Sequence, residues 1–175
     1  MLKSRIIIFG GQGFVGLNLI NSKLFDDRKI YVIGNKNKKI KSKYKVNKRN
    51  ITFKECNIFD IHKYKKLNFD NAVVIFAASN TDQSDFNKNL KKLFYHLSKF
   101  NLKKFLLLSS ISVYGNNKYD IHEKSKINPL SQYAKNCLSL EEIAKKTFNK
   151  QKLLYIFRIT NIFGFPKKNP GLIEK

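Results

Sequence analysis

The sequence is poor in cysteine and proline. Only 2 of its 175 residues are cysteine, and Cys56 and Cys137 lie far apart without metal-ligand spacing. This scarcity excludes a small disulfide-stabilised domain and indicates reduced thiols. The sequence has only 3 prolines, and no proline- or serine-rich stretch or internal repeat divides the chain. With 42% hydrophobic residues, the sequence predicts one globular domain.

Long apolar runs are also missing. No run approaches the roughly 20 apolar residues that a membrane-spanning helix needs. The N-terminus passes from Met1 into the apolar residues 6–9 and then into glycines. It therefore lacks the longer apolar stretch and the small-residue cleavage site of a secretory signal. These absences predict a soluble cytoplasmic protein without membrane association.

Acidic residues are scarce as well, because 12 Asp plus Glu stand against 35 Lys plus Arg, a formal charge of +23. A charge of this sign suggests nucleic-acid binding. However, 31 of the cations are Lys and only 4 are Arg, and 20 Asn and 19 Ile are present too. Lys, Asn and Ile share A- and T-rich codons, so genomic base composition is the simplest cause. A phosphate-binding surface would use more Arg, whose planar fork matches phosphate. Nucleic-acid binding therefore remains only a third hypothesis, which predicts affinity that falls steeply with salt.

Short β-branched apolar runs alternate with helical patterns along the chain. This alternation predicts an α/β fold, a Rossmann-like doubly wound parallel sheet with helices on both faces. Residues 34–50 include 7 Lys and 4 Asn, a composition that predicts a mobile surface loop. The expected strands are 5–9, 30–33, 51–56, 72–76, 105–108 and 153–157, and the expected helices are about 14–24, 83–100 and 131–149.

A glycine-rich segment, residues 10–16 (GGQGFVG), lies between the first strand and the first helix. The first glycine permits a tight turn, Gly13 lets the backbone approach a pyrophosphate, and Gly16 lets the helix lie close to the strand. Free N–H groups and the helix dipole attract a diphosphate. A turn with a close helix contact is the simpler alternative, but the flanking strand and helix favour a dinucleotide. The predicted contacts are Gly10, Gly13, Phe14, Val15 and Gly16.

The acidic residue that holds the adenosine ribose of NAD in such sites is missing after the second strand. Ile33 is followed by Gly34, Asn35 and Lys36, so a 2′-phosphate would meet cations and no carboxylate. The cofactor is therefore NAD or NADP, with NADP slightly favoured and Asn35 and Lys36 as predicted contacts. The alternative is that these lysines belong to the general lysine excess.

Two further motifs complete a family pattern. Residues 109–115 (SSISVYG) follow a strongly apolar strand, and Tyr133 begins a helix 23 positions after Ser110. With the glycine loop, which matches GxxGxxG, they resemble the extended short-chain dehydrogenase/reductase family. These are NAD(P)-dependent epimerases, dehydratases and reductases that act on nucleotide sugars. Residues 103–115 resemble the family's "VKRFVYLSS..VYG" stretch and residues 158–164 its "R..N.YGP" stretch, so the resemblance covers essentially the whole chain.

The resemblance implies roles for individual residues. Ser110 and Tyr133 would be the catalytic pair. The tyrosine would act as general acid/base on a sugar hydroxyl or carbonyl during hydride transfer, and the serine would orient the same oxygen. Tyr133 would also contact the cofactor, and Arg158 would make a substrate-side or structural contact. The further implied contacts are Asn57 and Ile58 at the adenine, Phe76, Ala77 and Ala78 beside the nicotinamide ribose and phosphates, and Ser110, Ser112 and Asn161 at the nucleotide-sugar substrate.

The family's catalytic lysine is missing. Four residues after Tyr133, where that lysine would hold the nicotinamide ribose and lower the tyrosine pKa, this sequence has Cys137. A neutral thiol supplies neither the charge nor the donors of an ammonium. Lys135 lies about 200° around the helix from Tyr133 and is no obvious substitute. Two hypotheses stay open: a nucleotide-sugar epimerase, dehydratase or reductase with impaired turnover, and a non-catalytic dinucleotide-binding or regulatory module.

Family members carry a C-terminal substrate-binding region after the segment that matches residues 158–164, and this sequence stops at Lys175. We therefore expect residues 1–175 to form an NAD(P)-binding domain, with the substrate-binding region largely absent. The resemblance also implies a homodimer. His62, His96 and His122 share no spacing with a metal site or catalytic triad. We assign them to the surface and expect no metal.

Overall fold

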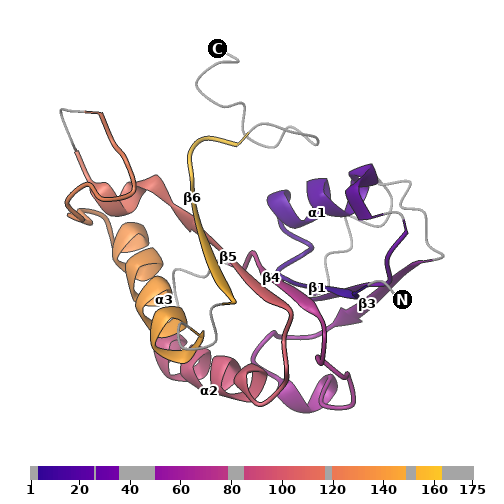
Figure 1. Ribbon diagram of the computed structural model, residues 1–175. Coiled ribbons are helices and arrows are strands. Elements are labelled where there is room, and N and C mark those ends of the chain that lie inside the picture. Colours follow the sequence, from indigo (N-terminus) through magenta and orange to yellow (C-terminus); the bar gives the residue numbers. More distant parts are fainter. Residues whose placement is uncertain are drawn as a thin grey trace.

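The computed structural model describes residues 4–25, 27–35, 50–78, 85–116, 120–148 and 153–162. Strands and helices alternate along the chain (Figure 1). The expected strands and helices are confirmed, with ends that differ by a few residues. The strands are β1 (Ile6–Phe9), β2 (Ile30–Gly34), β3 (Ile51–Glu55), β4 (Val73–Phe76), β5 (Lys104–Ser110) and β6 (Leu154–Ile159), the α-helices are α1 (Phe14–Asn21), α2 (Phe86–Ser98) and α3 (Gln132–Phe148), and the 3₁₀ helices are η1 (Lys23–Phe25), η3 (Ile61–Lys63) and η4 (Ile111–Tyr114).

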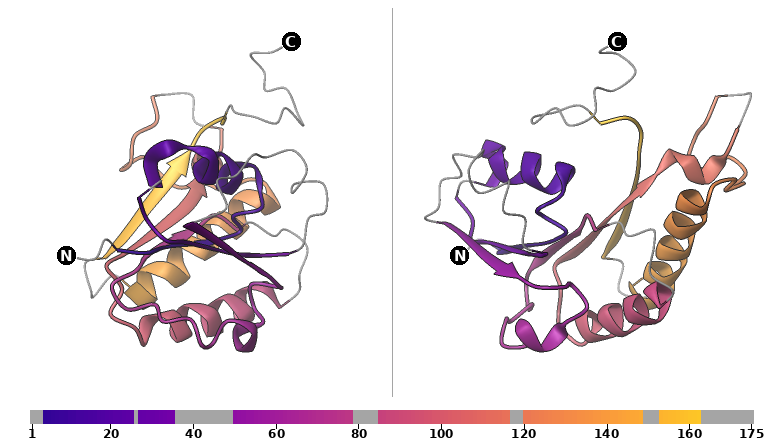
Figure 2. Two further views of the ribbon diagram at one scale, coloured as in Figure 1. Left: turned by 90° about the vertical axis from the view of Figure 1, so that its right-hand side faces the viewer. Right: turned by 180° about the vertical axis from the view of Figure 1, so that it is seen from behind.

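The strands form one parallel sheet in the order β3-β2-β1-β4-β5-β6. The chain steps outward from β1 through β2 and β3, and then returns to place β4 on the other side of β1. Ligands of such sheets bind beyond the carboxyl ends of the strands at this switch point. Helix α1 covers one face, and α2 and α3 cover the other (Figure 2). The predicted Rossmann-like doubly wound sheet is confirmed.

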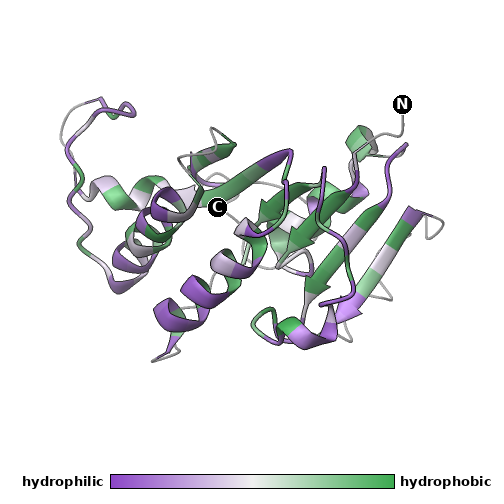
Figure 3. Ribbon diagram, turned by 60° about the horizontal axis from the view of Figure 1, so that its bottom comes forward, coloured by the Kyte–Doolittle hydropathy of each residue, from purple (hydrophilic) through white to green (hydrophobic). Residues whose placement is uncertain are grey.

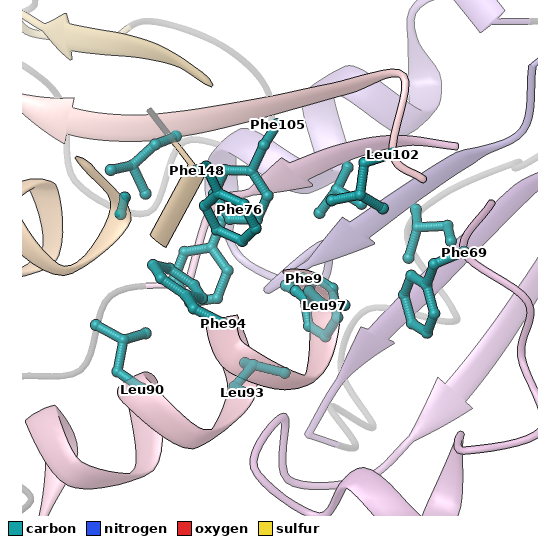
Figure 4. Close-up of a cluster of buried hydrophobic side chains, with 14 of the residues drawn as sticks. Phe9, Phe69, Phe76, Leu90, Leu93, Phe94, Leu97, Leu102, Phe105 and Phe148 are labelled. Carbon is teal, nitrogen blue, oxygen red and sulfur yellow. The ribbon is translucent and has the colours of Figure 1, made fainter. Parts of the chain in front are cut away.

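Phenylalanines fill the space between the sheet and helices α2 and α3 (Figure 4). Phe76 of β4 and Phe105 of β5 both pack against Phe94 of α2, with ring centroids 5.2 and 5.1 Å apart. Phe105 also stacks on Phe148 of α3 at 4.2 Å. All four side chains are fully buried. Because burying one Phe side chain stabilises a fold by about 1.5–3 kcal/mol, this cluster fixes α2 and α3 against β5.

The opposite face of the sheet has a smaller aliphatic core. Ile6 and Ile8 of β1 pack there with Ile20 of α1, whereas Ile7 and Phe9 of the same strand face α2 and α3. Alternate residues of a strand point to opposite faces, so β1 is apolar throughout because both of its faces are buried. Figure 3 shows the hydrophobic colour concentrated in the strands and the hydrophilic colour on the outer turns of the helices. No helix in the described ranges is long and apolar enough to cross a bilayer.

The surface assignment is wrong for His96. Its ring lies edge-on to Phe69 and Phe100, with centroids 6.2 and 5.5 Å apart. The Nε2 atom is buried and has no hydrogen-bond partner among the residues that the structure describes. The cause is its place on α2, one turn after the buried Leu93, which turns the ring toward the core. His62 and His122 are exposed, as expected.

His96 predicts a loss of stability in acid. Burial, and to a smaller extent Lys99, lowers the pKa of His96. The unfolded chain then binds this proton more tightly than the folded one. The contribution to stability is therefore complete above the ordinary pKa of about 6.5 and is lost as the pH falls through the lower folded value. The melting temperature of the wild type should fall more steeply between about pH 7 and pH 5 than that of His96→Gln. The exposed His62→Gln is the matched control with the wild-type slope, and equal slopes for wild type and His96→Gln would contradict the burial argument.

Candidate functional site

Two glycines shape the turn between β1 and α1. Gly10 has a φ of +74°, which a residue with a side chain rarely adopts. A Cβ atom at Gly10 would lie 2.6 Å from the Cα of Ala78, which follows β4. A Cβ atom at Gly16 would lie 2.3 Å from the Cα of Gly11. Both clashes are with backbone, so neither position accepts a larger residue, and the first turn of α1 lies directly on the end of β1.

The start of α1 is suited to an anion. Gly13 is the residue before the helix, and it caps α1 with no side-chain hydrogen bond. The first turn has no acidic residue. Phe14, Val15 and Gly16 form that turn, whose N–H groups have no acceptors within the helix. These N–H groups and the positive end of the helix dipole attract a phosphate.

The neighbouring strand ends continue this edge of the sheet. A Cβ at Gly34, the last residue of β2, would lie 3.8 Å from Gly10, and the Ala77 N–H donates to the Phe9 carbonyl at 2.9 Å. Asn35 is exposed beside Gly34. The predicted contact Lys36 lies outside the described residues. The ends of β2, β1 and β4 are thus side by side.

Three predicted contacts differ in what their side chains can offer. The Phe76 ring is buried in the phenylalanine core, so this residue presents only its backbone to the edge. Ile58 is half-buried, packs against the same core and accepts a hydrogen bond on its carbonyl from Tyr64. Asn57 is exposed, and its Oδ1 accepts from the Phe59 N–H at 3.0 Å. Of these side chains, Asn57 is the one at the surface.

Ser110, Tyr133 and Cys137 gather at the carboxyl end of β5. Ser110 is the last residue of the strand, and its Oγ accepts from the N–H and hydroxyl of Ser112 at 3.2 and 2.9 Å. Tyr133 lies in the first turn of α3, and Cys137 lies one turn later on the same face. The Tyr133 phenol lies within interaction range of the Ser110 hydroxyl and the Cys137 thiol. The structure thus brings together the two residues that the sequence paired.

This cluster raises the pKa of Tyr133. Burial is the largest cause, Cys137 adds to it, and the Ser110 hydroxyl acts in the opposite direction. Burial also raises the pKa of the Cys137 thiol. Both groups are therefore neutral at neutral pH. An ammonium in place of the thiol would instead lower the tyrosine pKa.

Sequence reasoning missed a buried ion pair behind this cluster. The carboxylate of Glu141 is fully buried, and Arg158 donates to its two oxygens from Nε at 2.9 Å and from Nη2 at 2.7 Å. Ser109 donates to the same carboxylate at 2.6 Å, and Arg158 Nη1 donates to the Tyr114 hydroxyl at 2.6 Å. Of the two roles expected for Arg158, these contacts support the structural one. The available signal was an acidic residue one turn after Cys137, on a helix face that is otherwise apolar.

The remaining substrate-side prediction has no contact with this cluster that the structure records. Asn161 is exposed and follows β6, at the same edge of the sheet as Ser110.

A cavity of about 510 Å³ lies between η4, α3 and β6, and Arg158 and Glu141 line it. Within the described parts of the chain, no three His, Cys, Asp or Glu residues are placed to hold a metal ion.

Comparison with known proteins assigns the chain to a family. Residues 6–174 match the sequence model described as the NAD dependent epimerase/dehydratase family. The chain belongs to this family. The resemblance seen in the motifs is therefore confirmed, and the doubly wound sheet is the fold of the relatives with known structure.

Two of the relatives are 4-epimerases at about a quarter sequence identity. An N-acetyl-alpha-D-glucosaminyl-diphospho-ditrans,octacis-undecaprenol 4-epimerase from Escherichia coli O157:H7 is 27% identical over 185 residues, which cover 97% of this chain and 52% of the relative. The UDP-N-acetylglucosamine 4-epimerase of Methanobrevibacter ruminantium M1, in complex with UDP-N-acetylmuramic acid, is 26% identical with a TM-score of 0.81, covering 98% of this chain and 60% of that one. The chain thus spans about half the length of the curated relative.

A third relative supports the fold alone. The UDP-glucuronic acid 4-epimerase of Bacillus cereus, in complex with NAD, has a TM-score of 0.74 at 19% identity. The match covers 91% of this chain and 57% of that one. The sheet and its helices are therefore shared beyond recognisable similarity of sequence.

Gly16→Ala should destabilise the protein. The added methyl group meets the backbone of Gly11, which cannot move aside as a side chain would, so we expect a loss of about 1–3 kcal/mol in urea unfolding. Gly34→Ala is the matched control, because its new Cβ meets the nearest atoms at an ordinary 3.8 Å. The control should stay within about 0.5 kcal/mol of the wild type. A Gly16→Ala protein as stable as the control would contradict the close approach of α1 to β1.

Proposed function

We propose that the chain binds a nicotinamide dinucleotide at the carboxyl edge of its sheet and transfers hydride slowly to and from a sugar carried on a diphosphate. Ser110 and Tyr133 are the proposed catalytic pair. The observation that carries this proposal is the position of that pair at the end of β5. In the sheet order β1-β4-β5, this end lies two strands from the glycine turn after β1.

The residues at the edge fit such a cofactor. Gly10 and Gly16 let the backbone segments pack closely, and this packing holds the uncapped N-terminus of α1 at the edge of the sheet. The N–H groups of Phe14 and Val15 would hold the diphosphate. Asn57 and Ile58 would lie at the adenine, and the backbone of 76–78 at the nicotinamide ribose. When bound here, the nicotinamide supplies the hydride acceptor and donor at its C4 atom.

The adenosine end of the site favours NADP slightly over NAD. Asn35 follows β2 at the place where a carboxylate would hold the two ribose hydroxyls of NAD. An amide there is neutral and does not repel a 2′-phosphate. The relatives with the cofactor named are bound to NAD, so the preference for NADP is a feature that we propose for this chain.

Tyr133 would move the proton of the reaction. As a neutral phenol it donates to a carbonyl oxygen, and as a phenolate it accepts the proton of a sugar hydroxyl. An unperturbed tyrosine is only about one part in a thousand phenolate at neutral pH. The raised pKa of Tyr133 makes that fraction smaller still. Ser110 would orient the same oxygen, and oxidation of a hydroxyl would be slow because the base form is rare.

The names of the relatives support the proposed substrate class. One acts on a sugar linked through diphosphate to undecaprenol, and another is named for a UDP-linked sugar. The shared chemistry is a sugar attached to a diphosphate carrier. Ser112, beside Ser110, and Asn161, at the end of β6, are the proposed substrate contacts.

A non-catalytic dinucleotide-binding module is the second candidate. The observation that favours it is the neutral Cys137 beside Tyr133, which raises the tyrosine pKa where the family's lysine lowers it. This candidate requires the glycine turn and the α1 N-terminus but not the tyrosine. The two candidates therefore differ in whether the Tyr133 phenol transfers a proton.

Cys137→Lys should restore hydride transfer. An ammonium beside Tyr133 lowers its pKa by about 1–3 units, so the rate at neutral pH should rise roughly ten- to a thousand-fold. The measurement is reduced nicotinamide formed in a single turnover with UDP-N-acetylglucosamine or a polyprenyl-diphosphate sugar. Cys137→Ala is the matched neutral control and should gain nothing.

Two further results separate the candidates. Tyr133→Phe in the Cys137→Lys background should abolish the gain while the chain still binds the dinucleotide, as measured by nicotinamide fluorescence, because Tyr133 is only one of the proposed cofactor contacts. If Cys137→Lys binds the dinucleotide and still gains no turnover, the catalytic proposal is contradicted and the binding module is supported.

A further inference from the structure

We propose that Arg158 and Glu141 are a positioning pair, which sets the rotation of α3 so that the Tyr133 phenol faces the Ser110 hydroxyl. The proposal rests on the proposed function only for the roles of the tyrosine and the serine. Neither charged residue touches the predicted reacting groups. Both act through the elements on which those groups are carried.

The pair connects the elements that carry the cluster. Arg158 lies on β6, and its guanidinium binds both oxygens of Glu141 on α3, at 2.9 and 2.7 Å. Its third contact is the hydroxyl of Tyr114 on η4, at 2.6 Å, and the guanidinium also stacks 4.8 Å above the Tyr114 ring. Ser109 of β5 completes the network with a 2.6 Å hydrogen bond to Glu141. Ser109 directly precedes Ser110, and Tyr114 follows it by four residues. The network therefore holds the chain on both sides of Ser110.

The apolar core packs against α3 from Leu140 to Phe148, and the ion pair adds bonds of fixed direction to this packing. A cavity of about 510 Å³ lies between η4, α3 and β6, and the ion pair lines it. Nearer to Tyr133, α3 meets η4 through a small buried cluster of Val113, Tyr114 and Cys137. Apolar contacts of this kind tolerate small rotations, whereas a planar guanidinium bound to both oxygens of a carboxylate does not.

The same contacts keep the Glu141 carboxylate ionised. Burial acts to raise the pKa of Glu141, but hydrogen bonds from Arg158 and Ser109 outweigh it and hold the pKa below its ordinary value. Lys145 lies 3.6 Å from the same carboxylate but is half-exposed. A carboxylate that is fully buried and charged keeps its partners, because an unpaired charge in this position is strongly unfavourable.

A small rotation of α3 at the Arg158–Glu141 pair would displace the Tyr133 phenol. Glu141 lies eight residues after Tyr133 on the same broad helix face, about 12 Å along the axis. A rotation of about 10° moves a hydroxyl that lies roughly 6 Å from the axis by about 1 Å. A misplacement of about 1 Å is enough to cost on the order of a hundredfold in a reaction that depends on orientation.

The test needs neither substrate nor turnover. It measures the coupling between Ser110 and Tyr133, defined as the change in the Tyr133 fluorine resonance that Ser110→Ala causes. The full chain is labelled with fluorotyrosine, and the Tyr133 fluorine resonance is identified by its loss in Tyr133→Phe. In the wild type, Ser110→Ala should shift this resonance because the two hydroxyl groups interact. In Arg158→Lys, which keeps the charge and loses the fork, the same Ser110→Ala change should shift it by less than about half as much.

Controls separate positioning from a general loss of structure. Lys145→Gln removes the exposed partner of Glu141 and should keep the full coupling. The Tyr64 resonance, from a buried ring in another part of the core, should stay unchanged in every variant. Tyr114→Phe removes a single hydrogen bond from Arg158 and should give a partial loss, which keeps the proposal testable if Arg158→Lys does not fold.

The outcomes are distinct. Full coupling in Arg158→Lys, or in Tyr114→Phe where only that variant folds, overturns the positioning role and leaves the proposed function standing. If Ser110→Ala leaves the Tyr133 resonance in place in the otherwise wild-type chain, the catalytic pair itself is contradicted, and the positioning role fails with it.

Discussion

The close approach of α1 to the end of β1 is the contact on which the functional edge of this protein depends. The backbone at Gly16 lies so near Gly11 that no side chain fits between them. The helix N-terminus is therefore held at the carboxyl end of the central strand, where its N–H groups and dipole would attract the phosphates of the proposed dinucleotide. Parallel pairing of β1 with β4, and of β4 with β5, then places Ala78 and Ser110 along the same edge. The proposed cofactor site and the proposed catalytic pair thus depend on one arrangement of strands.

The electrostatics of the two parts of this edge differ. The N-terminus of α1 offers a positive potential without a single charged side chain in its first turn. At β5, burial and the Cys137 thiol raise the pKa of Tyr133, at the place where the resemblance implies a cation. Charge is instead kept behind the cluster, in the buried pair of Glu141 and Arg158. The edge therefore carries a positive potential at α1, whereas the raised pKa of Tyr133 disfavours its phenolate form.

Most of the fold could be predicted from the sequence, because each strand and helix has a local pattern and the glycine turn has a fixed place between two of them. The pairing of Ser110 with Tyr133 came from the motif order. What local patterns could not show were contacts between distant segments. The ion pair joins positions 141 and 158, and the ring of Phe76 lies in the core rather than at the edge. His96 was placed on the surface because it shares no metal or catalytic spacing, and its contact with Phe69 joins two segments that local patterns do not connect.

The central claim is that residues 10–16 and the adjoining strand ends bind a nicotinamide dinucleotide. Amide resonances of the uniformly ¹⁵N-labelled chain, recorded during titration with NADP⁺ and with NAD⁺, test it most directly. The account predicts saturable shifts concentrated at residues 10–16, 77–78 and 110, at lower concentrations for NADP⁺ than for NAD⁺. A folded protein whose amides at 10–16 do not respond to either dinucleotide would contradict it.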